Sequence, residues 1–93
     1  MYALEIFEEQ KKVYFGWVDQ FRAAKAKAAK LVDIYNEVVF EDDEKAKMVQ
    51  NAENIVRAEI KRLEADMQLW RDTKFSKAQL KAMSQEYKAA RGL

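Results

Sequence analysis

Apolar side chains recur along the N-terminal part of the chain at alternating steps of three and four residues. The positions in this series are Tyr14, Trp17, Phe21, Ala24, Ala28, Leu31, Tyr35 and Val38. Such steps place side chains on one face of an α-helix and form the seam of a coiled coil. Gly16 lies within the series without shifting its phase, and a packed seam can offset the roughly 1 kcal/mol that an interior glycine costs. We therefore predict one continuous helix over residues 2–40.

A second apolar series follows with almost the same spacing, with one step of four in place of three. Its members are Val49, Ala52, Val56, Ile60, Leu63, Met67 and Trp70. Consecutive acidic residues at positions 41–44 separate the two series. Carboxylates stabilise the first turn of a helix and destabilise the last, because the helix dipole is positive at the N-terminus. The acidic run therefore predicts that the first helix ends near Phe40 and that a second helix covers residues 43–72.

The third predicted helix is bounded by capping signals. Ser76 followed by Gln79 has the spacing of a capping box, in which each side chain accepts a hydrogen bond from the other residue's amide. Gly92 is the residue type that most often ends a helix, because it adopts the left-handed conformation without strain. These signals predict a helix over residues 77–90. Its apolar face would carry Leu80, Met83, Tyr87 and Ala90.

The composition agrees with an entirely helical protein. The 93 residues include no proline and only two glycines, so little interrupts a helix. The 49% hydrophobic and 35% charged content is typical of globular or coiled-coil proteins rather than of disordered chains. We predict an all-α fold in which residues 1–93 form one domain: a long antiparallel helical hairpin followed by a short third C-terminal helix.

The first predicted helix is too long to be covered by its own chain. It would extend for roughly 57 Å, whereas a compact domain of this size has a diameter of about 30 Å. Several apolar residues also fall outside the two seams, namely Ile6, Val13, Phe15, Val18, Val32, Val39, Met48, Ile55 and Leu69. We therefore expect a second copy of the chain to cover part of this surface, giving a dimeric helical bundle.

Aromatic residues concentrate near the N-terminus, where six of the eleven lie within the first 21 residues. Those on the seam are explained by core packing, since aromatic side chains bury large areas. Tyr2 and Phe15 lie off the seam, and aromatic residues are common anchors at protein interfaces. We predict a partner-binding surface formed by Tyr2, Ile6, Phe15 and Val18, with ordinary packing in the core or the dimer as the alternative.

Charge is segregated along the first half of the chain, although the net charge is only +1. Residues 22–32 carry four cations and no acid, whereas residues 33–44 carry six acids and no base. The simplest interpretation is a solvated helix. The alternative is an antiparallel pairing of two copies that places opposite charges together and fixes their register. The contiguous acids lack the alternating ligands and the glycine of a calcium loop, so we expect no metal there.

A further group of cations lies near the C-terminus and is opposed there by Glu86 alone. Its members are Lys74, Lys77, Lys81, Lys88 and Arg91. Cations are favourable near a helix C-terminus and common on any protein surface. The alternative is a set of phosphate contacts to nucleic acid without base readout, although helix-turn-helix spacing and interleaved aromatic residues are absent.

Enzymatic chemistry is not expected from this sequence. The chain contains neither cysteine nor histidine, which excludes disulfides and the commonest metal ligands and activated nucleophiles. A glycine-rich phosphate-binding loop is also missing. Two or three helices offer little concavity in which a pair of carboxylates would act. We predict no catalytic residue, no cofactor and no metal.

The remaining expectations concern location and function. No segment approaches the roughly 20 apolar residues that span a bilayer, and residues 1–10 lack the features of a signal peptide. With no cysteine, a cytoplasmic protein is expected. We predict a small non-enzymatic protein-binding factor, an adaptor or inhibitor that docks a helical aromatic face on a larger protein. The alternatives are a nucleic-acid-associated accessory protein that uses the basic C-terminal helix, and a structural assembly or scaffold subunit.

Overall fold

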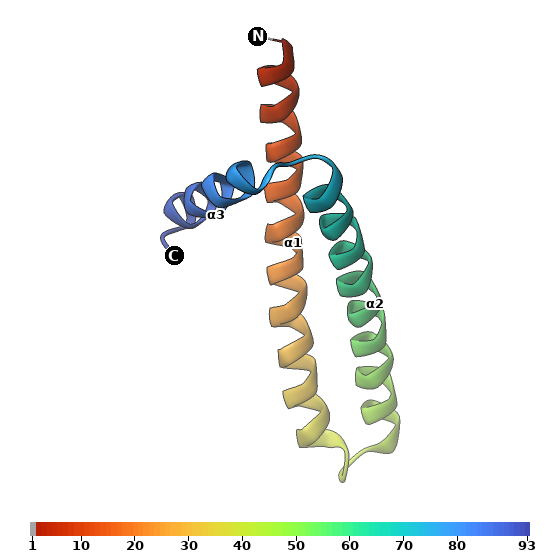
Figure 1. Ribbon diagram of the computed structural model, residues 1–93. Helices are drawn as coiled ribbons and strands as arrows, with labels where there is room; N and C mark the ends of the chain where they lie inside the picture. Colours follow the sequence, from red (N-terminus) through yellow and green to blue (C-terminus); the bar gives the residue numbers. More distant parts are fainter. Residues whose placement is uncertain (1) are drawn as a thin grey trace. The chain divides into compact units, whose positions relative to one another are not determined.

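The computed structural model describes residues 2–93, and their side chains from Ala3 onward. Three helices follow one another along the chain: α1 (Tyr2–Val38), α2 (Asp43–Thr73) and α3 (Lys77–Arg91) (Figure 1). No strand occurs over residues 2–93. The prediction of an all-α fold, with a long antiparallel hairpin and a short third C-terminal helix, is confirmed. The pairing of two copies stays a prediction.

Helix α1 continues through Gly16 without interruption. A Cβ atom placed on this glycine would meet no other atom within 4 Å, so packing does not require a glycine here. The apolar seam that continues on both sides of Gly16 is sufficient to hold the helix together, as its unshifted phase indicated.

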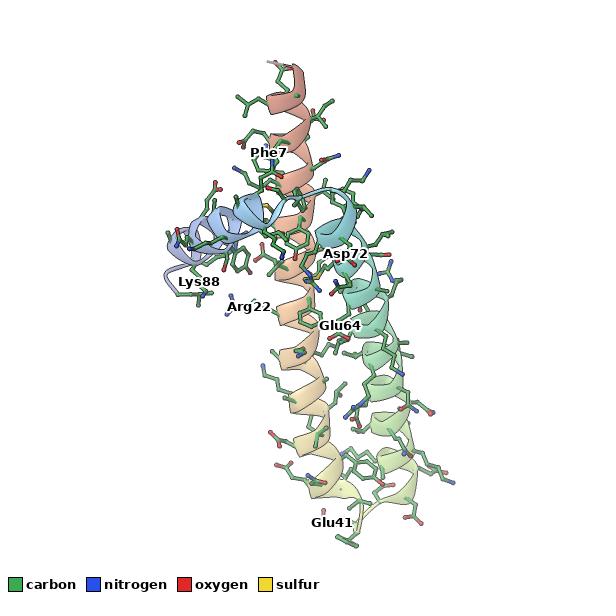
Figure 2. The ribbon with its side chains drawn as sticks, viewed as in Figure 1. Phe7, Arg22, Glu41, Glu64, Asp72 and Lys88 are labelled. Atoms are coloured by element: carbon green, nitrogen blue, oxygen red, sulfur yellow. The ribbon has the colours of Figure 1, made fainter. Side chains whose placement is uncertain are left out.

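The turn between α1 and α2 is closed by backbone and side-chain hydrogen bonds. The carbonyl of Val38 accepts from the amides of Glu41 at 3.0 Å and Asp42 at 2.9 Å, which ends α1 two residues before Phe40. The carboxylate of Asp42 accepts from the amide of Lys45 at 3.1 Å, as a helix cap does. Glu41 is labelled in this turn in Figure 2. The acidic run therefore serves the start of α2, where the helix dipole favours negative charge.

Both ends of α3 are capped by the residues that the sequence singles out. The hydroxyl of Ser76 accepts from the amide of Gln79 at 3.1 Å, and the side chain of Gln79 accepts from the amide of Ser76 at 2.8 Å. At the other end Gly92 is left-handed, with φ of 68°, and its amide donates to the carbonyl of Ala89. These caps fix α3 as a helix of 15 residues that starts directly after Ser76.

The chain divides into two compact units. Residues 1–18 and 65–93 form the first, which we call the three-helix unit because it contains parts of α1 and α2 together with α3. Residues 19–64 form the second, which we call the hairpin unit because it contains the remaining parts of α1 and α2 and the turn that joins them.

Short side chains dominate the core of the hairpin unit. Its buried residues are Ala24, Ala46, Val56 and Leu63, none of them more than 7% exposed. Alanine lets two helices approach closely, but it buries little apolar area. Larger apolar residues of the same unit stay on its surface, namely Ile34, Phe40, Met48 and Ile55. Two helices therefore leave much of the unit's apolar surface in contact with solvent.

Large side chains form the core of the three-helix unit. Its buried residues are Tyr14, Met67, Phe75, Met83 and Tyr87. The ring of Phe75 meets the rings of Phe7, Tyr14 and Trp70 edge-on, with centroids 6.0, 5.5 and 6.3 Å apart. Edge-to-face pairs of this kind add about 0.5–1.5 kcal/mol each beyond the area that they bury. Phe75 precedes the cap of α3, so its burial anchors the start of that helix.

Candidate functional site

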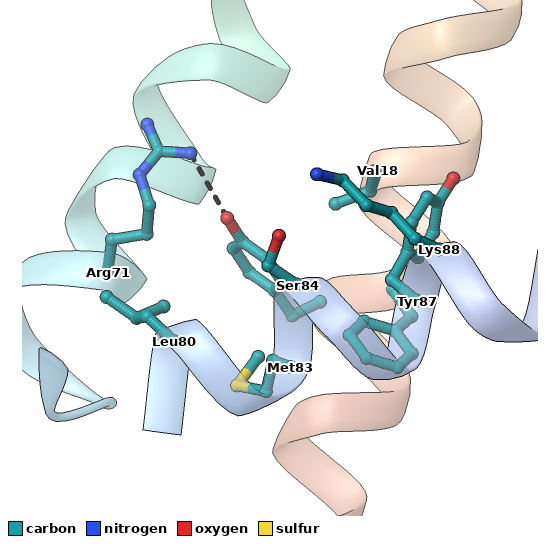
Figure 3. Close-up of a pocket in the computed structure, with 9 residues that line it drawn as sticks. Val18, Arg71, Leu80, Met83, Ser84, Tyr87 and Lys88 are labelled. Atoms are coloured by element: carbon teal, nitrogen blue, oxygen red, sulfur yellow. Dashed lines mark hydrogen bonds between the residues drawn. The ribbon is translucent and has the colours of Figure 1, made fainter. Parts of the chain in front are cut away.

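A cleft of about 250 Å³ opens in the three-helix unit, where α3 packs on α1. Figure 3 shows the side chains that line it. They come from all three helices and are Tyr14, Phe15, Val18, Arg71, Leu80, Met83, Ser84, Tyr87 and Lys88. Most of these side chains are apolar or aromatic, with a few polar groups among them. This composition is typical of binding clefts.

The walls of the cleft are held by contacts between aromatic rings and a guanidinium. Met83 and Tyr87 are 2% and 8% exposed, and the half-buried ring of Phe15 meets the ring of Tyr87 edge-on at 5.4 Å. The guanidinium of Arg91 lies 4.0 Å from the centroid of Tyr87 and 5.6 Å from that of Phe15. Cation–π contacts at these distances are favourable and restrain both rings. The cleft is therefore formed by side chains that already have defined positions.

Two cations border this cleft without a carboxylate partner in the described part of the chain. Arg71 donates to the hydroxyl of Tyr14 at 3.1 Å, the dashed line in Figure 3, and to the side-chain oxygen of Gln68 at 2.7 Å. Both acceptors are neutral. No ion pair within residues 3–93 includes Arg71 or Lys88. The apolar cleft thus carries positive charge that no carboxylate within residues 3–93 neutralises by an ion pair.

The residues predicted to bind a partner are only partly brought together by the fold. Phe15 and Val18 are half-buried and line the cleft. Ile6 is 39% exposed on α1 and does not line it. The side chain of Tyr2 lies outside the described residues. The cleft therefore combines two of the four predicted residues with side chains from α2 and α3.

Sequence reasoning missed Arg71 as a member of this site. Its contact with Tyr14 joins residues 57 positions apart, and no local pattern signals such a contact. Ser84 was missed as well, because a lone hydroxyl on a helix carries no signal. The apolar face of α3 was predicted from the spacing of its residues. Helical periodicity does not show, however, against which other helix such a face packs.

The predicted phosphate contacts occupy different environments. Lys74, Lys77 and Lys81 are exposed on the surface of the three-helix unit. Lys88 lines the cleft, and Arg91 stacks on the aromatic rings of its wall. The five residues therefore separate into an exposed lysine group at the start of α3 and two cations at the cleft.

Beside the cleft, a cluster of paired charges ties α1 to α3. The amine of Lys11 lies 2.9 Å from Glu8 and 3.0 Å from Glu86. Its hydrogen bonds to Glu8 and then to Glu86 raise the pKa of Lys11 above its ordinary value of 10.5, against the opposing effect of desolvation. The amine of Lys11 is therefore paired with carboxylates, whereas Arg71 and Lys88 at the cleft are not.

A groove in the hairpin unit is the second candidate site. It lies between α1 and α2 and is wide, open and more polar than the cleft. Two of its three cations have contacts within the unit: Arg57 pairs with Glu53 at 2.6 Å, and Lys25 lies over the ring of Phe21 at 4.8 Å. The third cation, Lys61, lines the groove together with the carboxylate of Glu64, whereas the lining of the cleft has cations and no acid.

Over residues 2–93, no group of three or more acidic side chains is arranged to hold a metal ion. None of the helices in this range has the length and the apolar content that crossing a membrane requires. No protein-family model, no curated protein sequence and no solved structure matches this chain.

Proposed function

We propose that this chain is a non-enzymatic protein-binding factor, an adaptor or inhibitor that docks the cleft of its three-helix unit on a larger protein. The observation that carries the proposal is an apolar cleft, open to solvent, whose bordering cations Arg71 and Lys88 have no carboxylate partner within residues 3–93. Aromatic residues and arginine are the residue types that contribute most at protein interfaces. Both types form this cleft.

The rigidity of the cleft supports the same function. The ring of Tyr87 is buried between Phe15 and Arg91, and Lys11 links α1 to Glu86 of α3. Binding to a preformed surface loses less conformational entropy than binding that must first order its contacts. A small protein with such a surface can bind a partner without rearranging.

A variant in which a large side chain fills the cleft tests the proposal. Ser84 is exposed and lines the cleft, whereas the neighbouring Gln85 is exposed and does not line it. We expect S84W to fill the cleft and to lose proteins that the unaltered chain retains in quantitative co-purification from its host. The matched variant Q85W adds the same side chain elsewhere and should retain them. Recovery of the same proteins by both variants, with helicity unchanged by circular dichroism, contradicts the proposal.

We further propose that a second copy of the chain covers the exposed face of α2 in the hairpin unit. Met48 and Ile55 are both 71% exposed and lie seven residues apart, which is two helical turns and therefore one face. Sedimentation should give a dimer for the unaltered chain and a monomer for M48E/I55E. Q50E, on another face of the same helix, is the control. A monomer at millimolar concentration of the unaltered chain contradicts this pairing.

The nucleic-acid alternative has less support in the geometry. Lys74, Lys77 and Lys81 are available to phosphates, but Arg91 is engaged with aromatic rings and Lys88 borders an apolar cleft. Binding by these lysines would weaken steeply as the salt concentration rises, because it depends on the release of counterions.

A further inference from the structure

We infer that the cleft recognises an acidic–apolar segment of the partner protein, in which one large apolar side chain enters the cleft and a neighbouring carboxylate pairs with Arg71 and Lys88. This inference rests on the proposed function, since it specifies the chemistry of the partner at the same site. It is carried by the balance of charge around the cleft, by the geometry of Arg71 and by the size of the opening.

Within residues 3–93, no carboxylate pairs with the cations that line the cleft. The lining includes Arg71 and Lys88 and no acidic side chain. Glu86, on the same helix as Lys88, is held by Lys11 at 3.0 Å. Asp72, next to Arg71 in the sequence, accepts a hydrogen bond from Gln68 at 2.9 Å. A carboxylate brought by a partner would therefore find two cations beside an apolar wall, where charge-assisted hydrogen bonds are stronger than those between neutral groups.

The guanidinium of Arg71 can bind such a carboxylate without a change in its position. A guanidinium has five N–H donors, and the two contacts of Arg71 within the chain use one donor on each terminal nitrogen. Tyr14, which accepts one of these bonds, is itself only 8% exposed and fixes the guanidinium at the cleft. Donors remain on a side chain whose position is already restrained, which reduces the entropy lost on binding.

The size of the opening favours a side chain over a whole cofactor. The cleft measures about 250 Å³, below the roughly 300–1,000 Å³ of pockets that hold drug-sized ligands. Its wall of Phe15, Leu80 and Tyr87 suits an apolar group, which a nucleic acid backbone does not offer. Anchoring one buried side chain in a pocket, with charged contacts beside it, is a common arrangement at protein interfaces.

Two capped dipeptides test the inference by NMR titration, one of phenylalanine and glutamate and the other of phenylalanine and glutamine. They differ in a single carboxylate. We expect both to shift the amide signals of Ser84 and Tyr87, and the glutamate peptide to bind about two- to fivefold more tightly at low salt, which is the upper part of the range for a solvent-exposed ion pair. In K88Q this preference should fall, and in R71Q/K88Q it should disappear. K81Q, an exposed lysine of the same helix outside the cleft, should retain it.

The outcomes separate this inference from the proposal on which it rests. Equal binding of the two dipeptides at the cleft overturns the inference and leaves the protein-binding cleft intact. Absence of any shift at Ser84 and Tyr87 with both dipeptides contradicts the docking site itself. Shifts at the cleft caused by a thymidine oligonucleotide, with none from the dipeptides, overturn the inference in favour of nucleic acid. K88Q alone keeps the test valid if R71Q/K88Q does not fold, because Lys88 is exposed and holds no contact within the core.

Discussion

The two compact units use the same pair of helices but bury different kinds of side chain. In the three-helix unit, α3 provides a third wall, and large residues such as Phe75, Met83 and Tyr87 are buried. In the hairpin unit only two helices meet, and the buried positions include Ala24 and Ala46. The comparison shows that a third helix allows large side chains to be enclosed. A cleft with defined walls occurs where that helix packs.

This difference in buried side chains predicts which of the two units is the more stable. A buried aromatic side chain removes 150–250 Å² from water, at about 25 cal/mol per Å² of apolar area, and alanine removes far less. All five ring pairs found within residues 3–93 belong to the three-helix unit. We expect this unit to be the more stable of the two, and the hairpin unit to depend more on a second copy.

The largest effect is expected from Phe75→Ala. This side chain is 7% exposed and contacts three other rings, so its removal leaves a cavity at the centre of the three-helix unit. Truncation of a buried phenylalanine costs about 3–5 kcal/mol of unfolding free energy. Urea denaturation followed by the fluorescence of Trp17 and Trp70, whose rings are 4.6 Å apart, measures the loss.

The control for this truncation is Phe40→Ala in the hairpin unit. Phe40 is 96% exposed, so the same chemical change should alter the unfolding free energy by less than about 0.5 kcal/mol. Similar losses for the two variants would mean that the aromatic cluster does not stabilise the three-helix unit, and the comparison between the units would fail.

An intermediate effect is expected from Ala24→Leu, which tests the small core of the hairpin unit. Ala24 is 7% exposed, so a leucine there has to push the two helices apart or distort its own rotamer. Overpacking of this kind costs about 1–3 kcal/mol. Ala26→Leu is the matched control, because Ala26 is exposed on the same helix and leucine has a good helix propensity. Equal thermal stability of the two variants would indicate that the hairpin is loosely packed.

The elements of this fold were predictable because their signals are local. The steps of three and four gave α1 and α2, and Ser76, Gln79 and Gly92 gave the bounds of α3 to within a residue. The end of α1 was predicted two residues too late. The turn begins at Val38, whose carbonyl accepts hydrogen bonds from two backbone amides that lie after the end of the helix. Hydrophobic periodicity carries no information about such hydrogen bonds.

The cleft was less predictable because it depends on contacts between distant segments. Phe15 and Val18 were identified as apolar residues off the seam, which is a local property. That α3 packs beside them, and that Arg71 bonds Tyr14, are consequences of tertiary packing. A single sequence shows which faces are apolar but not which faces meet.

A smaller effect is expected from Ser76→Ala, which removes a cap from the helix that distinguishes the two units. The hydroxyl of Ser76 accepts a hydrogen bond from Gln79, and the loss of such a cap costs about 1 kcal/mol. Hydrogen exchange should become faster in the first turn of α3 and stay unchanged in the hairpin unit. Ser84→Ala, in the middle of the same helix, is the control and should leave the exchange rates unchanged. An equal change in both units would show that α3 is not an independent support of the three-helix unit.

The smallest effect is expected from Lys11→Met, which removes the charge link between α1 and α3. Lys11 lies 2.9 Å from Glu8 and 3.0 Å from Glu86, and ion pairs whose carboxylates remain open to solvent, as these two do, contribute up to about 1 kcal/mol. The pKa of Lys11 is raised above 10.5 in the folded protein, so its contribution is fully present below pH 10.5 and is lost as the pH rises through the raised value. The difference in unfolding free energy between the unaltered chain and Lys11→Met should therefore be constant near neutral pH and vanish in strong alkali.

Lys12→Met is the control for general alkaline effects, because Lys12 is exposed and belongs to no ion pair within residues 3–93. If the difference for Lys11→Met persists in alkali, the methionine affects packing rather than charge, and α3 is held to α1 by the aromatic contacts alone.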